Sequence, residues 1–273
     1  METKVAFENL KVVNIEATNK CNLRCVSCGD NKTRTAGFIS LELCEKLANQ
    51  CKDKELRLFM SGEPLLHPSI DELIKICRKH SDTVVLHTNA TLLDAQTGEK
   101  LIKANLTRLS ISFDGITKNE YESNRRGAKF ESVTENIKTF LKMNNGRIAV
   151  AIQRIIPYNS EEKADLSTFF PGASSYPVIY RHSWDIKGLI PGVKPASFYA
   201  SQCYFLWNYF SILWDGRANL CCADIGGREI IGDANTETIE NLWNCKKLMH
   251  VRSCMIKRIK TSAICDGCER YGI

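Results

Sequence analysis

Six short, β-branched apolar runs recur in the first two thirds of the chain, with segments of helical periodicity between them. Most runs lack an alternating polar face, as expected for parallel strands that are covered on both sides. The runs cover residues 12–17, 56–60, 83–87, 108–113, 148–156 and 178–181. Strand–helix alternation with right-handed crossovers predicts a parallel α/β sheet. Six units are too few to close an eight-stranded barrel, so we expect an open, partial (β/α)6 barrel.

The segments between these runs carry apolar residues at helical spacing. The i, i+3, i+4, i+7 pattern over residues 44–51 and 70–77 predicts two amphipathic helices. Ser69, with Glu72 three residues later, predicts a capping box at the start of the second helix. Further helices are predicted over residues 131–143 and 161–169. The cysteines on the apolar stripes are expected to pack in the core, namely Cys44, Cys51 and Cys77.

The pattern changes near residue 190, where glycine and proline residues interrupt the periodicity. Two later apolar runs, residues 210–214 and 218–221, flank Asp215-Gly216 and predict a hairpin with a two-residue turn. A helix is predicted over residues 238–251. We therefore expect two domains: the partial barrel over residues 1–190, and a small α+β domain, a hairpin plus a helix, over residues 191–273.

Composition argues against several classes of protein. No stretch approaches the ~18 apolar residues of a membrane span, and the N-terminus lacks the apolar core of a signal peptide. Thirteen cysteines without an export signal point to reduced thiols that bind metal, and to the cytoplasm. The formal net charge is +6, but the basic residues are dispersed. We therefore expect neither a membrane nor a nucleic acid as partner.

A first group of ligand-like cysteines, Cys21, Cys25 and Cys28, directly follows the first predicted strand. Three thiolates at this spacing can bind three corners of a cubane iron–sulfur cluster, and no fourth ligand follows promptly. Clusters and structural zinc sites generally use four ligands, so an exogenous ligand is implied at the open iron. The alternative is part of a zinc site that is completed elsewhere in the chain.

A second group lies near the C-terminus and consists of Cys203, Cys221, Cys265 and Cys268. The predicted hairpin carries one of these cysteines, and Cys265-Asp-Gly-Cys268 presents two ligands from one tight turn. Four thiolates complete a cubane without an open iron. A zinc ribbon with four thiolate ligands is the alternative.

The Cys-x3-Cys-x2-Cys run of the first group resembles the signature of the radical S-adenosylmethionine (radical SAM) enzymes. Ser61-Gly62-Glu63-Pro64, after the second predicted strand, is similar to the Gly-Gly-Glu-Pro motif with which that family holds the methionyl amine of SAM. Ser61 stands where the family has its first glycine. The resemblance covers roughly residues 10–185, and it implies that the first cluster binds SAM at its open iron.

The resemblance also implies further contacts with SAM, at the ends of the later strands and in the loop after the fourth. The residues expected to contact its ribose and methionine are Thr88, Asn89, Ser112 and Asp114. Gln153 matches a position where the family often places a polar contact, and Arg125 is expected to pair with the carboxylate of SAM.

The second cysteine group resembles the twitch appendage, the shortened form of the SPASM extension of radical SAM enzymes, which holds one auxiliary [4Fe–4S] cluster. The implied cofactors are therefore SAM and two [4Fe–4S] clusters. An external electron donor such as flavodoxin or ferredoxin is the implied partner. Three cysteines of this region are left over by the pattern: Cys222, Cys245 and Cys254.

The chemistry implied is cleavage of SAM to a 5′-deoxyadenosyl radical, which removes hydrogen from a C–H bond of a small polar substrate. The smallest relatives with this layout include an aminocyclitol dehydrogenase, so the expected reaction is two-electron oxidation of a secondary alcohol in a sugar or aminocyclitol. Lys187 falls near a substrate-contacting arginine of that enzyme. The candidate substrate contacts are Arg181, His182, Trp184 and Lys187. Other histidines are expected to be structural, although His87 is placed to line the mouth of the barrel.

Three alternatives stay open at this point. A radical epimerase needs a cysteine that returns hydrogen to the substrate, for which Cys222, Cys245 and Cys254 are candidates. An enzyme that oxidises or crosslinks a peptide is the second, since many SPASM relatives act on peptides. A zinc-ribbon binding protein is the non-enzymatic alternative.

Overall fold

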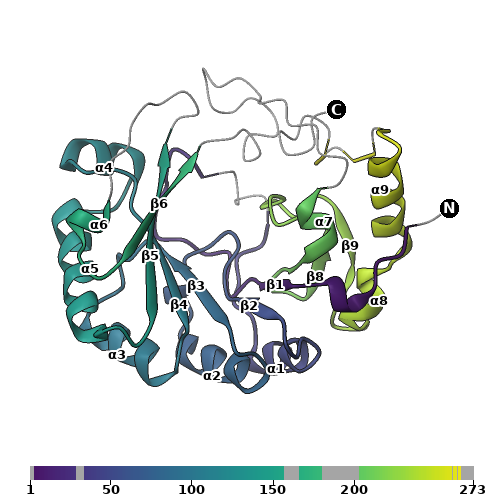
Figure 1. Cartoon of the computed structure of the whole chain (residues 1–273), viewed down its shortest axis with the longest axis horizontal. Helices are drawn as coiled ribbons and strands as arrows, with labels where there is room; N and C mark the ends of the chain where they lie inside the picture. The colour runs from purple at the N-terminus through teal and green to yellow at the C-terminus, as the bar shows by residue number, and fades with distance from the viewer. Residues whose placement is uncertain are drawn as a thin grey trace.

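The computed structural model describes residues 3–28, 34–156, 166–179, 203–259, 261–262 and 264–265. In this part of the chain one curved sheet has the strand order β6-β5-β4-β3-β2-β1-β7-β8-β9 (Figure 1). Its strands are β1 (Val12–Ile15), β2 (Glu55–Arg57), β3 (Val84–Thr88), β4 (Arg108–Ser112), β5 (Ala149–Ile156), β6 (Ser174–Ile179), β7 (Tyr209–Ile212), β8 (Arg217–Asn219) and β9 (Ile230–Asp233). The pairs from β6 to β7 are parallel, and the last two pairs are antiparallel.

Each of the six predicted apolar runs contributes to a parallel strand, which confirms the α/β class and the open, partial barrel. The register places Val13 beside Leu56, and Leu56 beside Val84. Because side chains alternate along a strand, this register turns the apolar residues of successive strands toward the same face of the sheet.

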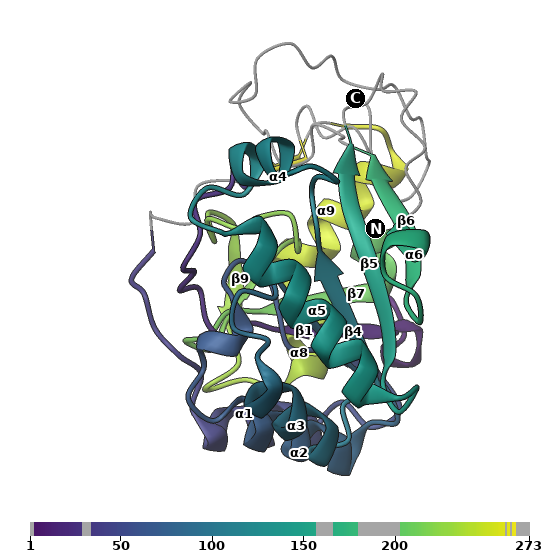
Figure 2. The ribbon, with the colours of Figure 1, turned by 90° about the vertical axis from the view of Figure 1, so that its left-hand side faces the viewer.

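Helices cover that face (Figures 1 and 2). The elements of this half are the 3-10 turns η1 (Phe7–Asn9) and η2 (Pro64–Leu66), and the helices α1 (Leu41–Asn49), α2 (Ile70–His80), α3 (Ala95–Lys103), α4 (Lys118–Asn124), α5 (Phe130–Asn144) and α6 (Leu166–Phe169). The predicted helix over residues 131–143 is confirmed as α5, whereas residues 161–165 of another lie outside the described residues. No helix of the described ranges has both the length and the apolar character needed to cross a bilayer.

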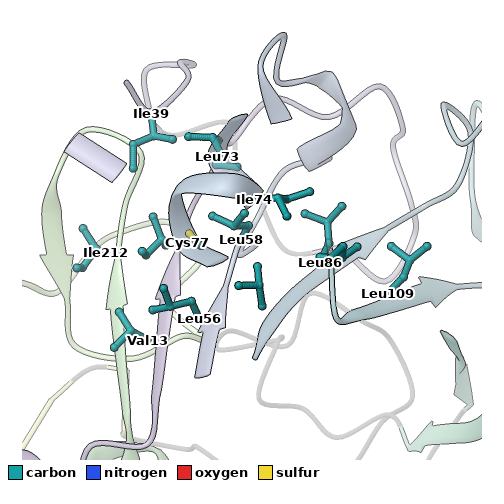
Figure 3. Packing of buried hydrophobic residues seen from close by; sticks show 14 of the residues in the cluster. Val13, Ile39, Leu56, Leu58, Leu73, Ile74, Cys77, Leu86, Leu109 and Ile212 are labelled. Carbon is teal, nitrogen blue, oxygen red and sulfur yellow. The ribbon is translucent and has the colours of Figure 1, made fainter. Parts of the chain in front are cut away.

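The core lies between the sheet and these helices, and Figure 3 shows its centre. Leu73, Ile74 and Cys77 of α2 pack against strand side chains such as Leu56 and Leu86, and all five are fully buried. Cys44 and Cys51 are fully buried as well, which confirms the prediction that the cysteines on the helical stripes belong to the core.

The predicted capping box at the start of α2 is wrong. The helix begins at Ile70, but the Ser69 side chain makes no capping hydrogen bond. Instead, Ser69 N donates to His67 Nδ1 (3.1 Å), while His67 Nε2 donates to Ile39 O (2.9 Å). Burial lowers the pKa of His67, which fits this neutral tautomer.

The C-terminal strands extend the same sheet, because β7 pairs in parallel with β1 over its whole length. The predicted boundary between residues 190 and 191 lies outside the described residues, so the division into two domains stays a prediction. The short helix α7 (Tyr204–Asn208) precedes β7, and α8 (Ile239–Trp243) and α9 (Lys246–Ile256) follow β9.

The hairpin of β7 and β8 is confirmed, but its predicted two-residue turn is wrong. Leu213 N donates to Arg217 O (2.9 Å), and Gly216 N donates to Leu213 O (2.9 Å), so the loop between the paired Leu213 and Arg217 has three residues, 214–216. Only Gly216 has a positive φ there (+91°), whereas a two-residue type I′ turn needs two such residues.

The single helix predicted over residues 238–251 is two helices, α8 and α9. Trp243 is the last residue of α8. The buried guanidinium of Arg252 donates a hydrogen bond from Nη1 to the carbonyl oxygen of Trp243 (2.7 Å). The side chain of Asn244, at the break, pairs with both the N–H and the C=O of Val5 (2.9 Å each). The break is therefore held by long-range contacts that no local pattern reveals.

Candidate functional site

The first cysteine group lies in the loop that follows β1. Arg24 N donates to Arg126 O (2.9 Å) and Val26 N donates to Asn124 O (2.9 Å), so this loop pairs with the end of α4 and the segment after it. Free thiols occupy all three positions of the group: Cys21, Cys25 and Cys28.

The three thiols influence one another and a nearby cation. Burial raises the pKa of Cys21 and of Cys25. At Cys28, desolvation and then the charges of Cys25 and Cys21 raise the pKa to about 11, while Arg125 lowers the pKa of all three thiols. Thiols that resist ionisation alone but face one another suit a metal cluster, whose charge ionises them. The residues present therefore fit an iron–sulfur cluster.

A second observation bears on what this loop could hold. Among the described residues, no three His, Cys, Asp or Glu side chains converge on the position of a single metal ion. The thiolates of a cubane bind different irons, so they need not converge in this way.

The turn after β2 packs directly against this loop. Glu63 N donates to Lys20 O (2.8 Å). A Cβ added to Gly62 would lie 2.2 Å from Thr18 O and 2.6 Å from Lys20 O, so only glycine permits this approach. The turn that is predicted to hold the amine of SAM therefore also supports the cysteine loop.

The Glu63 carboxylate is buried and joins the ends of two strands. Thr88 Oγ1 donates to its Oε1 (2.7 Å), and Asn89 N donates to its Oε2 (2.7 Å). Burial raises the pKa of Glu63, and these hydrogen bonds lower it. The side chain of Asn89 contacts the cysteine loop: its Nδ2 donates to Asn22 Oδ1 (3.0 Å) and lies 4.0 Å from Cys21 Sγ. These contacts gather the predicted SAM residues of β2 and β3 beside the cysteines.

Asp114 and Arg125 form a buried ion pair. Arg125 Nη2 lies 2.7 Å from Asp114 Oδ2, and Arg125 Nε donates to the same oxygen (2.8 Å). Asp114 Oδ1 accepts from Ile155 N (2.8 Å), which ties the loop after β4 to β5. Burial lowers the pKa of Arg125, but the charges of Asp114 and then Cys25 outweigh it and raise that pKa. Arg125 therefore stays a cation beside the cysteines, and its predicted pairing with the carboxylate of SAM stays a prediction.

The face of the sheet opposite the helices carries polar and aromatic side chains near the strand ends. Gln153 Nε2 donates to Ser112 Oγ (3.3 Å) and to His87 Nδ1 (3.4 Å). The His87 ring stacks on Phe59, with centroids 3.6 Å apart and an interplanar angle of 17°. Burial, and then the charge of Arg57, lower the pKa of His87 to about 3, so this imidazole is neutral. His87 thus contacts Gln153, which in turn contacts Ser112, and the last two are predicted SAM contacts.

His87→Gln is expected to make the free energy of unfolding less dependent on pH. The native pKa of about 3 lies below the ordinary value of 6.5, so the unfolded chain binds more protons between these values, and stability falls as the pH drops. Between pH 6.5 and 5.0 the wild type should lose about 1.5 to 2 kcal/mol from this group, which the variant retains. Urea unfolding at both pH values measures the difference, with the exposed His250→Gln as control. Equal pH dependence in wild type and His87→Gln would contradict the expectation.

The second cysteine group is described in part. Cys203 is the N-cap residue of α7, and Cys221 follows β8. The Cys221 sulfur accepts a hydrogen bond from Ala223 N (3.4 Å). The pKa of Cys221 is raised, mainly by a hydrogen bond with Cys222 and secondly by burial. Cys265 is buried. The residues present suit a site for anionic sulfur ligands, because a backbone N–H is already directed at one sulfur.

The three remaining cysteines of this region lie in different settings. Cys222 adjoins Cys221, as just described, and Cys245 is the N-cap residue of α9. Cys254, within α9, is buried with its Sγ 3.5 Å from His250 Nε2. Their assignment as hydrogen donors stays a prediction.

Several predicted residues lie outside the described part of the chain, and their roles stay predictions. They are Arg181, His182, Trp184, Lys187 and Cys268.

A buried ion pair beside the predicted SAM turn, Glu16 with Arg34, was missed by the sequence analysis. Arg34 Nη1 donates to Glu16 Oε2 (2.8 Å) and Nη2 donates to Oε1 (2.6 Å), with side chains 4% and 0% exposed. The signal was a carboxylate inside the apolar run of residues 12–17, because a buried charge requires a partner. The identity of that partner could not be read locally.

Two family models match the chain. The Radical SAM superfamily matches residues 15–165, more than half of the chain, and the SPASM iron–sulfur cluster-binding domain matches residues 203–269. The first match contains the first cysteine group, and the second contains the whole second group.

Curated relatives agree with the family but are matched over limited lengths. A GTP 3′,8-cyclase of Chlorobaculum tepidum is 35% identical over 134 residues, 47% of this chain and 40% of that protein. An AdoMet-dependent heme synthase of Methanosarcina barkeri is 33% identical over 133 residues, 46% and 38% of the two chains. A GTP 3′,8-cyclase of Syntrophomonas wolfei is 27% identical over 82% of this chain and 72% of that protein. This chain therefore spans less than half of the first two relatives.

Solved structures share the fold at low identity. BtrN in complex with AdoMet and 2-DOIA has a TM-score of 0.63 and 14% identity, over 98% of this chain and 93% of that one. Streptococcus suis SuiB bound to precursor peptide SuiA has a TM-score of 0.68 and 15% identity, over 96% and 70%. AnSMEcpe with bound AdoMet has a TM-score of 0.64 and 17% identity, over 96% and 91%. These structures show the shared fold. The two family matches show that this chain belongs to the radical SAM superfamily and binds SAM and [4Fe–4S] clusters.

Proposed function

We propose that the chain is an oxidoreductase that dehydrogenates a secondary alcohol of a sugar or aminocyclitol. When bound, SAM and its cluster supply a 5′-deoxyadenosyl radical, which removes a hydrogen atom from a C–H bond. The auxiliary cluster, held by the second cysteine group, would supply an acceptor for the second electron of the oxidation. The chain itself has to bind the alcohol, orient its C–H bond and take up its hydroxyl proton.

The observation that carries this proposal is a set of uncharged hydrogen-bonding side chains on the face of the sheet opposite the helices. Ser112 and Gln153 are predicted SAM contacts, and the neutral His87 beside Gln153 offers a hydrogen-bonding group without a net charge next to the SAM site. Phe59, stacked on His87, adds an aromatic surface. A hydroxylated ring has both hydroxyl groups and an apolar C–H face, so these side chains match its chemistry.

His87 orients rather than accepts a proton in this proposal, because a group with a pKa of about 3 is a weak base at neutral pH. Lys187, Arg181 and His182 stay the candidates for handling the hydroxyl proton. A cation at Lys187 would favour deprotonation of a hydroxyl beside a radical carbon.

The similarity to BtrN supports the proposal, because it extends over 98% of this chain and 93% of that one. The similarity to SuiB, whose structure contains a precursor peptide, favours peptide modification as a second candidate, although this chain covers only 70% of SuiB. The similarity to the Syntrophomonas wolfei GTP 3′,8-cyclase, which extends over 82% of this chain at 27% identity, favours a nucleotide substrate as a further candidate.

The test is anaerobic turnover of the reconstituted protein with SAM, a reductant and a panel of aminocyclitols and sugars. We expect equal amounts of 5′-deoxyadenosine and of a product lighter by two hydrogens. In D2O, a product of unchanged mass that gains one deuterium would instead establish an epimerase, and Cys222, Cys245 and Cys254 would then be replaced in turn. Turnover of peptides alone would favour the second candidate. A colourless protein that holds zinc and cannot be reconstituted with iron would refute the proposal that the chain is an oxidoreductase.

A further inference from the structure

The buried ion pair of Glu16 and Arg34 reaches the turn that is predicted to hold the amine of SAM. Arg34 Nη2 donates to Ser61 Oγ (2.7 Å), and Ser61 Oγ donates to Glu16 Oε1. Carboxylate, guanidinium and hydroxyl thus form a closed triangle at the end of β2. A glycine at position 61, as in the motif that this turn resembles, could make neither hydrogen bond, so the triangle depends on the serine at this position.

The same guanidinium reaches the C-terminal part of the sheet. Arg34 Nε donates to Ile225 O (3.0 Å), and Trp214 N donates to Glu16 Oε2 (3.2 Å). Ile225 directly follows a turn in which Asp224 N donates to the carbonyl of Cys221 (2.9 Å). One side chain therefore connects the predicted SAM turn to a segment that begins at a predicted auxiliary-cluster ligand.

The geometry makes this connection stiff. Arg34 uses all three nitrogens, and a guanidinium is planar, so its partners are held at fixed directions. Both charged side chains are almost fully buried, so removing one partner leaves the other unpaired at a large cost.

We propose that Arg34, oriented by Glu16, is a positioning residue that fixes the Ser61–Gly62 turn against the C-terminal strands and thereby sets the affinity for SAM. The inference rests on the amine-binding role predicted for that turn, and it is independent of the substrate.

A double-mutant cycle on the reconstituted full-length protein tests this inference, with the Kd for SAM as the readout. Arg34→Met should weaken SAM binding about 10- to 100-fold, as losses of supporting contacts around a cofactor site do. Ser61→Gly should weaken it by a smaller factor. The variant with both changes should weaken binding by less than the product of the two single effects, because the hydroxyl and the guanidinium contact each other and support the same turn.

A matched control separates positioning from general destabilisation. Arg252 is also a buried arginine that donates to backbone carbonyls, at Leu206 O (2.9 Å) and Trp243 O (2.7 Å), but it does not touch the SAM turn. Arg252→Met should lower the stability and leave the Kd for SAM within about twofold of wild type. If Arg34→Met does not bind iron, Arg34→Lys replaces it in the cycle, because lysine keeps the charge but cannot reach Glu16, Ser61 and Ile225 together.

Additive effects of the two changes would overturn the proposal, as would an unchanged Kd in Ser61→Gly. An equal loss of SAM binding in Arg252→Met would reduce Arg34 to a structural role. These outcomes are distinct from failure to find a substrate, since no substrate is present.

Discussion

Replacing Cys21, Cys25 and Cys28 together by alanine is expected to abolish cleavage of SAM and to remove one of the two clusters. The three thiols share one loop and are free, and the charge of Cys25 raises the pKa of both Cys21 and Cys28. No other described cysteine lies on that loop. Anaerobic iron analysis of the reconstituted variant should therefore give about four irons per chain in place of about eight. The 5′-deoxyadenosine formed with SAM and a reductant should fall to the level of the reductant alone.

The control for this variant is Cys51→Ala. Cys51 is fully buried in the core and belongs to neither cysteine group, so its loss should lower stability without changing the iron content. If the triple variant kept its iron and still produced 5′-deoxyadenosine, the assignment of the first cluster to this loop would be wrong.

Gly62→Ala is expected to have the second largest effect, although it adds a single methyl group. The new Cβ would lie 2.2 Å from Thr18 O and 2.6 Å from Lys20 O. Both obstacles are backbone atoms of the segment that leads into Cys21, so the clash can be relieved only by moving that segment or the turn itself. Overpacking of this kind costs about 1 to 3 kcal/mol, and a loss of that size in SAM binding raises the Kd for SAM by about 5- to 150-fold.

The Kd for SAM of the reconstituted variant measures this effect, and Gly146→Ala is the control. Gly146 has a φ of +78°, so alanine strains the backbone there too, but the added Cβ meets no atom within 4 Å. We expect Gly146→Ala to lower the stability and to bind SAM normally. Normal SAM binding by Gly62→Ala would show that the turn adapts and that its glycine is not needed for the site.

Much of the barrel could be predicted from the sequence because its strands are buried on both faces. Such strands appear as unbroken apolar runs, and each of the six runs became a parallel strand. The helices α2 and α5 were predicted because their buried face appears in the sequence as a regular apolar stripe. The helix α3 was not, and its Gly98 explains part of the difference. A Cβ there would lie 2.6 Å from Met143 Cε and 2.8 Å from Phe140 Cδ2, so packing against α5 requires a residue that weakens the local helical signal.

The motif residues of the candidate site could be located by their positions at strand ends, but their contacts could not. Glu63 and Asp114 both accept backbone N–H groups from a neighbouring strand, Asn89 N and Ile155 N respectively. In the fold, these carboxylates connect adjacent strands. Their hydrogen-bond partners depend on which strands become neighbours, and a motif does not encode the strand order.

The sequence by itself determined the class of fold, the two cysteine groups and the strand ends at which the chemistry gathers, because buried strands and metal ligands leave local patterns of residue type and spacing. Only the tertiary structure decided that β7 joins β1 in one sheet, that the last predicted helix breaks at Asn244, and that Arg34 links Glu16, Ser61 and Ile225. Each of these depends on hydrogen bonds between segments far apart in the chain. A buried charge or carbonyl takes whichever partner the completed fold brings within reach, and neighbouring residues do not specify that partner.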